Sequence, residues 1–398
     1  MKKVLFLGVI LASMTLVACG GGNNGGGSGA KEKGPWTVKF DTNGGAETYE
    51  DQIVPNKGLV TDPGTPTKSD DKGTYQFMGW RYDGAAWSFS VSKVTKNMTL
   101  TARWLEKYSV QYKNADGTDA GAVTYVDSGT ALTAPTTTPT APAGQRFYGW
   151  MNTENGGQIW DFNDASLNKV MGDTVLKPLF VKDVDAQQFE AELVPDFKLS
   201  KWGPKGMPGT TYSGGQNGLG LIGKEELDAQ GKNKLGSSGY YTIENKNYSA
   251  YVQFMYVEGD TLTWEINSSK AVTDATLFMR LSAEYGSPDP QTDEIKNYFS
   301  HEEFQVIVND TPLQYGTITL HNIVQTLIPF QDYFVSASVS LRQGANTIQM
   351  KVNNSRDVTS AIHAAAPCID AIKLFTDSEL TFTNATPTNI QKDQPQAA

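Results

Sequence analysis

The sequence predicts an all-β protein, because both its composition and its local pattern are typical of strands. Its 398 residues include 39 glycines and 18 prolines, and 11% of them are aromatic. A turn-rich and aromatic-rich chain favours short strands over helical bundles. Apolar and polar residues alternate over short segments such as 37–40, and no stretch between residues 36 and 180 has convincing helical periodicity. The length predicts two or three domains.

The net charge and the residue counts argue against several classes of function and site. The formal net charge is −10, which argues against nucleic-acid binding because such proteins usually carry a basic stripe. No segment after residue 19 has the roughly 18 consecutive apolar residues that a transmembrane helix needs. The chain has two cysteines and three scattered histidines, so we expect no disulfide framework, no His-rich metal site and no His-based catalytic triad.

The first 19 residues are typical of a bacterial targeting segment. Lys2 and Lys3 precede an apolar stretch at 4–17, and the segment ends in Leu-Val-Ala before Cys19. This ending resembles the bacterial lipobox, which implies cleavage before Cys19 and lipid attached to it; the alternative is a plain signal peptide with a chance cysteine. The Gly-rich residues 20–35 cannot form a core and predict a flexible tether. We therefore expect lipid anchoring at the extracellular face of the cell membrane.

An internal repeat occupies the next part of the chain. Residues 36–104 align with residues 108–180 at a spacing of about 70 residues, which is too long for a solenoid repeat. Each copy is therefore expected to be a small domain, repeat 1 at 36–106 and repeat 2 at 107–182. Three pairs of segments carry the alignment: Phe77-Met78-Gly79-Trp80 with Phe147-Tyr148-Gly149-Trp150, Trp87-Ser88-Phe89 with Trp160-Asp161-Phe162, and Ala102-Arg103-Trp104 with Pro178-Leu179-Phe180.

Repeat 1 resembles the internalin-type B repeat of bacterial surface proteins. The marks are F-D-T-N-G-G from Phe40, the F-x-G-W segment, and the closing A-R-W. Repeat 2 lacks N-G-G and closes on Pro-Leu-Phe, so it is a divergent copy. The resemblance implies a compact β-grasp-like fold that acts as a stalk or adhesive spacer without catalysis. We expect Trp80 and Trp150 to lie in the cores, with sugar stacking at an exposed face as the alternative.

Residues 185–378, the C-terminal module, predict a β-sandwich. Short strands follow one another with polar turns between them, as in all-β sandwiches. The expected strands are Tyr240–Ile243, Ala250–Val257, Thr261–Ile266, Ala275–Leu281, Phe304–Val308, Ser336–Leu341, Asn346–Val352 and Ile369–Phe375. The polar, aperiodic residues 379–398 predict a disordered tail.

Carboxylates occur at both ends of the C-terminal module. Glu190 and Glu192 are two residues apart, so they lie on one face of a strand. Asp370 is a lone acid in an apolar strand, where a charge is costly unless it is paired. If the first and last strands are neighbours, the three carboxylates converge and need a cation, and oxygen ligands favour calcium. The alternative is that the two glutamates are solvated residues of an edge strand.

The module resembles carbohydrate-binding module families six and thirty-five over about Gln187 to Thr376. The resemblance rests on E-A-E, a G-x-x-G turn, Q-G-A-N-T-I, V-N-N and the closing I-D-x-I-K. It implies a jelly-roll sandwich, a structural calcium held by Glu190, Glu192 and Asp370, and a sugar site in loops at one end. Asn353 or Asn354 would contact the sugar there. Long segments at 202–234, 284–302 and 356–367 depart from the family pattern.

Sugar recognition needs aromatic faces beside a few polar groups. Four aromatic residues fall in the expected loops, and each has the alternative of covering the core: Trp202, Tyr212, Tyr285 and Tyr333. Tyr285 is best placed, because it follows the strand that ends at Leu281.

We expect no enzyme activity. Asp289, Asp293 and Glu294 form an acidic cluster, but they lie in a segment of turn composition, and no common hydrolase, metalloprotease or phosphate-loop motif is present. The sequence therefore predicts a surface lipoprotein that binds a glycan or polysaccharide of a host or cell-wall surface. The binding module is held off the membrane by two repeat spacers. The alternatives are a structural or protein-adhesive surface protein and a glycoside-acting enzyme.

Overall fold

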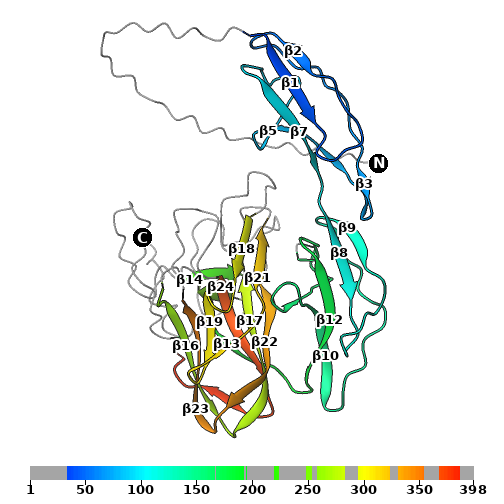
Figure 1. Cartoon of the computed structure of the whole chain (residues 1–398). Coiled ribbons are helices and arrows are strands. Elements are labelled where there is room, and N and C mark those ends of the chain that lie inside the picture. The colour runs from blue at the N-terminus through cyan, green and yellow to red at the C-terminus, as the bar shows by residue number, and fades with distance from the viewer. Residues whose placement is uncertain are drawn as a thin grey trace, which may run out of the picture.

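A computed structural model describes residues 34–165, 167–191, 194, 219–223, 248–252, 258–282, 295–322, 330–353 and 367–385. Within these ranges every named element is a β-strand, so the all-β prediction is confirmed (Figure 1). No helix in this part of the chain is long and apolar enough to cross a membrane. The expected signal segment, Cys19 and nearly all of the tether lie outside the described residues.

Repeat 1 is a five-stranded sheet in the order β2-β1-β7-β5-β6. β1 and β7 run parallel beside each other, as in a β-grasp-like domain, and the other pairs are antiparallel. The ring of Trp80 lies in the core with Phe40, Tyr49 and Phe77 edge-on at 5.3, 5.6 and 5.8 Å. The strands are β1 (Trp36–Asp41), β2 (Gln52–Val54), β5 (Phe77–Tyr82), β6 (Ala85–Ala86) and β7 (Met98–Trp104), with a separate hairpin of β3 (Ser69–Asp70) and β4 (Gly73–Thr74).

Repeat 2 has the same strand order, β9-β8-β12-β10-β11, and its β8 and β12 are again parallel. Trp150 packs against the core with Tyr112 at 5.3 Å and Phe147 at 6.0 Å. Trp80 is therefore a core residue, as predicted, and Trp150 is a partly buried residue that packs against the core. The strands are β8 (Lys107–Tyr112), β9 (Thr124–Asp127), β10 (Gln145–Asn152), β11 (Gln158–Ile159) and β12 (Thr174–Lys182).

The C-terminal module is a β-sandwich, as predicted. Its first sheet has the order β14-β15-β24-β17-β22, and β13 also pairs with β24. The bounds of these strands are β13 (Gln187–Glu190), β14 (Leu219–Gly223), β15 (Tyr248–Val252), β17 (Val272–Ser282), β22 (Gln331–Leu341) and β24 (Cys368–Phe375). Its second sheet has the order β20-β19-β23-β16-β25: β16 (Thr261–Ser268), β19 (Phe304–Val308), β20 (Thr311–Leu313), β23 (Gly344–Val352) and β25 (Leu380–Phe382). A two-stranded antiparallel sheet of β18 (Ile295–Phe299) and β21 (Ile318–Asn322) completes the described strands. The largest side chains in the core are Trp264, Tyr333, Phe299 and Phe304.

The observed strands extend the predicted ones and correct one boundary. β16, β17, β19, β22, β23 and β24 contain the six predicted segments from Thr261 onward. The tail does not begin at residue 379, because β25 pairs with β16 and Leu380 is only 8% exposed. The predicted strand Tyr240–Ile243 lies outside the described residues.

Repeat 2 is joined to the sandwich by strand pairing. β11 pairs with β22 through Gln158 and Tyr333, so the sheet of repeat 2 continues into the first sheet of the C-terminal module. Figure 1 shows repeat 2 lying beside β22, with repeat 1 beyond the far end of repeat 2. The two repeats therefore have different neighbours.

Candidate functional site

The first and last strands of the C-terminal module are neighbours. β13 pairs antiparallel with β24, and Glu190 lies opposite Ala371, next to Asp370. This is the condition under which the sequence predicted converging carboxylates. Glu192 and the G-x-x-G turn of the resemblance, at residues 236–239, lie outside the described residues.

Asp370 already has a positively charged partner. Its side chain is fully buried, and its Oδ2 accepts a hydrogen bond from Arg280 Nε at 2.7 Å. Glu190 Oε1 accepts one from Gln188 Nε2 at 2.7 Å. Among the described residues, no three His, Cys, Asp or Glu side chains lie close enough together to hold a metal ion. A carboxylate can contact a guanidinium and a cation through different oxygens, so the calcium site at Glu190, Glu192 and Asp370 stays a prediction.

Asn353 lies at the end of β23 and holds a neighbouring turn. Its backbone N–H donates to the Glu303 carbonyl at 2.8 Å, and its exposed side-chain amide donates to the Glu302 carbonyl at 3.1 Å. The amide therefore fixes the turn before β19. Asn354 lies outside the described residues.

Tyr333 is not a loop residue, which corrects the sequence prediction. The strand was expected to begin at Ser336, but β22 begins at Gln331, and strand alternation turns Tyr333 into the core. Its side chain is 1% exposed, and burial raises the pKa of its hydroxyl. It is therefore inaccessible for stacking on a sugar. The other aromatic candidates, Trp202, Tyr212 and Tyr285, and the acidic cluster at Asp289, Asp293 and Glu294 lie outside the described residues.

A charged cluster on the outer face of the first sheet was not predicted. Asp332 of β22 accepts hydrogen bonds from Lys373 Nζ at 2.7 Å, Tyr148 Oη at 2.6 Å and Arg280 Nη1 at 3.2 Å. Together with Asp370, it forms a group of two carboxylates and two cations. The sequence carried one signal, charged residues beside apolar ones in the segments that form β17, β22 and β24, but these residues are too far apart in the chain to pair by inspection.

The surroundings of this cluster set its protonation. Burial would raise the pKa of Asp332, but the Lys373 charge and hydrogen bonds from Lys373 and Tyr148 outweigh burial and lower it. Burial raises the pKa of the Tyr148 hydroxyl, and the Asp332 carboxylate adds to the shift. Asp332 therefore carries its charge beside a neutral Tyr148, whose hydroxyl donates a hydrogen bond to it. This arrangement suits a structural contact between domains.

The two repeats match one known family. The model of the Listeria-Bacteroides repeat domain matches residues 36–103 and 108–177. The chain carries two Listeria-Bacteroides repeat domains. Both matches fall within repeat 1 and repeat 2 as the sequence defined them, so the predicted internal repeat is confirmed.

Curated relatives cover between a third and two fifths of the chain. Two proteins of Evansella cellulosilytica, whose names class them as membrane proteins and one of them as Gly-rich, are 31% identical over 140 residues and 30% identical over 160 residues. These alignments cover 34% and 39% of this chain. The chain spans only 20% and 17% of the length of these relatives.

Solved structures with some similarity include carbohydrate-binding modules. A family 35 module from an environmental isolate is 18% identical, with 38% of this chain and 85% of the module covered and a TM-score of 0.24. A family 35 module from Clostridium thermocellum is 14% identical, with 48% of this chain and 99% of the module covered and a TM-score of 0.25. A likeness of this size carries no information about a ligand.

Proposed function

We propose that this chain is a cell-surface lipoprotein that binds a glycan through its C-terminal module. Cys19 would carry the lipid at the extracellular face of the cell membrane, and residues 20–35 would form the tether. The glycan or polysaccharide would belong to a host or cell-wall surface. No catalytic role is part of the proposal.

The positions of the sequence motifs in the sandwich carry the glycan proposal. The E-A-E segment begins at the end of β13, the I-D-x-I-K segment lies in its neighbour β24, and Q-G-A-N-T-I and V-N-N run along β23 into Asn353. The segments that resemble carbohydrate-binding families six and thirty-five therefore occupy the first strand and the last two long strands of a single two-sheet fold. A chance resemblance would not be expected to follow the strands in this way.

The proposed sugar site is the loop end at Asn353 and Asn354, with Tyr285 and Trp202 as stacking residues. An amide can both donate to and accept from a pair of sugar hydroxyls. A few neutral hydrogen bonds of about 0.5–1.5 kcal/mol each and one stacked ring correspond to a dissociation constant between about micromolar and millimolar. Calcium at Glu190, Glu192 and Asp370 would brace the paired ends of the module; it would not take part in binding.

A glycan array tests this proposal on the chain from residue 20 onward. We expect weak, selective binding, and we expect Asn353→Ala with Asn354→Ala to abolish it. Because Asn353 also bonds to Glu302, a melting curve of the variant and the single variant Asn354→Ala separate lost binding from a lost turn. The proposal fails if no glycan binds or if the double variant binds as well as the wild type. Release of free sugar would instead favour the enzyme alternative.

The anchor is tested separately. We expect Cys19→Ala to release the chain from the membrane fraction or to leave it unprocessed. Radiolabelled fatty acid that enters the variant as well as the wild type would contradict the anchor without touching the glycan proposal.

A further inference from the structure

The outer sheet face of repeat 2 is buried against the C-terminal module. One apolar cluster contains side chains of both parts: Tyr148, Met151, Ile159, Leu179, Val181 and Val184 from repeat 2 and its end, and Phe278, Phe334 and Phe375 from the module. The ring of Tyr148 lies 4.8 Å from that of Phe278 and 5.2 Å from that of Phe375. Phe278 and Phe375 are 0% and 1% exposed although they point away from the sandwich core. Repeat 2 supplies the cover over these two rings.

The same face of repeat 1 carries different residues. The strand registers match pair for pair, because Gly79 lies opposite Arg103 as Gly149 lies opposite Leu179. In the same way, Arg81 of repeat 1 occupies the position of Met151 in repeat 2. Met78 occupies the position of Tyr148 and is 45% exposed. The positions that dock in repeat 2 are therefore polar or exposed in repeat 1.

The turn between β10 and β11 fits closely against the module. Gly157 has a φ of +79°, and a Cβ there would lie 2.8 Å from the Phe334 carbonyl oxygen. Phe334 N–H donates to the Gly157 carbonyl at 2.9 Å. Asn155 accepts from Thr319 N–H at 2.5 Å and donates to the Thr319 carbonyl at 2.9 Å. The backbone of repeat 2 thus approaches the backbone of the module directly, which a transient contact would not require.

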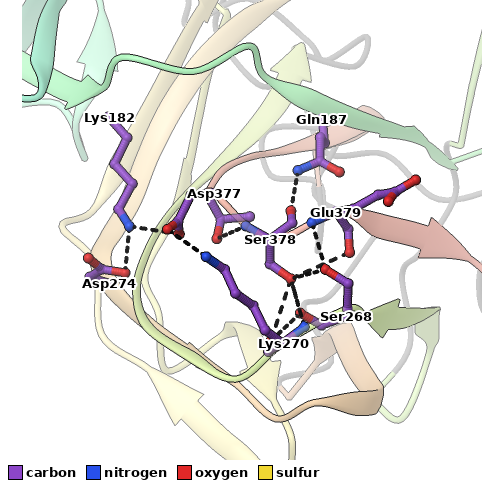
Figure 2. Close-up of polar contacts among 10 residues, drawn as sticks. Lys182, Gln187, Ser268, Lys270, Asp274, Asp377, Ser378 and Glu379 are labelled. Carbon is purple, nitrogen blue, oxygen red and sulfur yellow. Dashed lines mark hydrogen bonds and ion pairs between the residues drawn. The ribbon is translucent and has the colours of Figure 1, made fainter.

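Polar contacts also join repeat 2 to the module on two sides of this interface. The Tyr148 hydroxyl donates to buried Asp332, and so it covers the charged cluster of Arg280 and Lys373. At the end of β12, Lys182 bridges Asp274 at 2.8 Å and Asp377 at 3.1 Å. Figure 2 shows Lys182 reaching from repeat 2 to these two carboxylates, with Lys270 on the other side of Asp377.

The junction between the two repeats is built differently from the junction between repeat 2 and the module. Leu105 and Glu106 connect them, and Lys107 and Lys72 lie 5.8 Å from the rings of Tyr75 and Tyr125. Among the apolar clusters of the described residues, one lies wholly in repeat 1 and another wholly in repeat 2, and none contains residues of both. Long side chains over partly exposed rings hold the repeats together only weakly.

We propose that the outer sheet face of repeat 2 is a permanent docking surface, so that residues 107–382 form one folding unit and repeat 1 forms another. Repeat 2 is then a structural part of the C-terminal module, and the chain has one spacer domain where the sequence predicted two. The divergent Pro-Leu-Phe ending of repeat 2 follows from this role, because Leu179 is a docking residue.

Hydrogen exchange on the full chain tests the docking surface. The variant Met151→Arg with Leu179→Arg gives repeat 2 the residues with which repeat 1 folds, so it opposes docking without opposing the repeat fold. We expect exchange in β17 and β22 to speed up at least tenfold. The matched control is Arg81→Met with Arg103→Leu in repeat 1, which we expect to change exchange in the module less than twofold. Unchanged exchange in β17 and β22 of the first variant, or an equal loss in the control, overturns the proposal.

A second measurement does not depend on any variant. In the wild-type chain, native-state exchange at rising denaturant reports the opening free energy of each segment. We expect β8, β10 and β12 to open together with β17 and β22, and β1 and β7 to open separately. Opening of repeat 2 at a different free energy from the module overturns the proposal. So does opening of repeat 1 together with them.

Discussion

Repeat 1 and repeat 2 have the same fold in two different surroundings. Their strand orders match, and their central apolar positions are equally buried: Leu100 and Leu176 are 0% exposed, as are Val94 and Val170. Their outer sheet faces differ, because the module covers that face in repeat 2 and not in repeat 1. The inner face of this sheet specifies the fold, and the outer face is free to change with its neighbour.

Pro178 shows how far the central strand β12 can diverge from its counterpart in repeat 1. Its counterpart in repeat 1 is Ala102, opposite Trp80, as Pro178 is opposite Trp150. β12 pairs with β8 only from Thr174 to Leu176, so beyond that point it has β10 as its remaining ladder partner. A proline is tolerated where a strand has one neighbour, because no second ladder loses a donor.

The largest expected effect comes from the shared core. Leu100→Ala and Leu176→Ala should each lower the free energy of unfolding by about 2–5 kcal/mol, because each deletes a fully buried side chain. The two variants should differ in how far the destabilisation extends through the molecule. Leu176→Ala should also weaken exchange protection in β17 and β22, and Leu100→Ala should not. Equal effects of both variants on the module would contradict the comparison.

If the carboxylates of the module bind calcium, the metal should stabilise repeat 2 and the module but not repeat 1. A metal at 100 times its dissociation constant stabilises by about 2.7 kcal/mol. A chelator should therefore lower the melting temperature of the transition that contains repeat 2 and the module, and calcium should restore it. The transition of repeat 1 is the internal control. Identical melting curves with chelator and with calcium would remove the calcium site and leave Arg280 as the counter-charge of Asp370.

Two Tyr→Phe variants compare a hydrogen bond in the interface of repeat 2 with an exposed hydrogen bond in repeat 1. Tyr148→Phe removes a hydrogen bond to Asp332, whose side chain is only 11% exposed. This should cost about 1–3 kcal/mol because the carboxylate loses a partner where little water reaches it. Tyr75→Phe removes a bond to exposed Asp70 in repeat 1 and should change stability by less than about 0.5 kcal/mol. Denaturant unfolding measures both. A loss in Tyr148→Phe no larger than in Tyr75→Phe would argue against a tight interface.

The smallest effect is expected at Lys182. Hydrogen bonds from Lys270 and Lys182 lower the pKa of Asp377 to about 2 from its ordinary 3.8. A lowered pKa in the folded state means that Asp377 stabilises above pH 4 and loses this contribution as the pH falls towards 2. Lys182→Met should therefore lower the melting temperature slightly at pH 7 and less at pH 2. High salt should reduce the difference. An effect that is equal at both pH values would show that the ion pair contributes nothing.

The sequence by itself determined the local order of this protein. Alternating segments around Trp80 and Trp150 predicted both repeats, and six strands of the module were found because β-patterns are local. It also named the pairing of the first and last strands as the condition for a calcium site, and β13 and β24 are paired. The predictions that failed concern strands whose limits depend on residues far away in the sequence. The apolar residues before Ser336 gave no sign that β22 begins at Gln331, and β25 is a strand only because β16 lies beside it.

The tertiary structure decided what the outer faces do. β17, β22 and β24 carry apolar side chains on both faces, with Phe278, Phe334 and Phe375 on the outer one, and a sequence pattern cannot tell which residues cover that face. Tyr148 and Asp332 are 184 residues apart, yet a 2.6 Å hydrogen bond joins them. Arg280 and Asp370 are 90 residues apart and form an ion pair where the sequence predicted only a metal ligand. Charge and apolar pattern specify that a group needs a partner, whereas only the packing of the whole chain specifies which group that partner is.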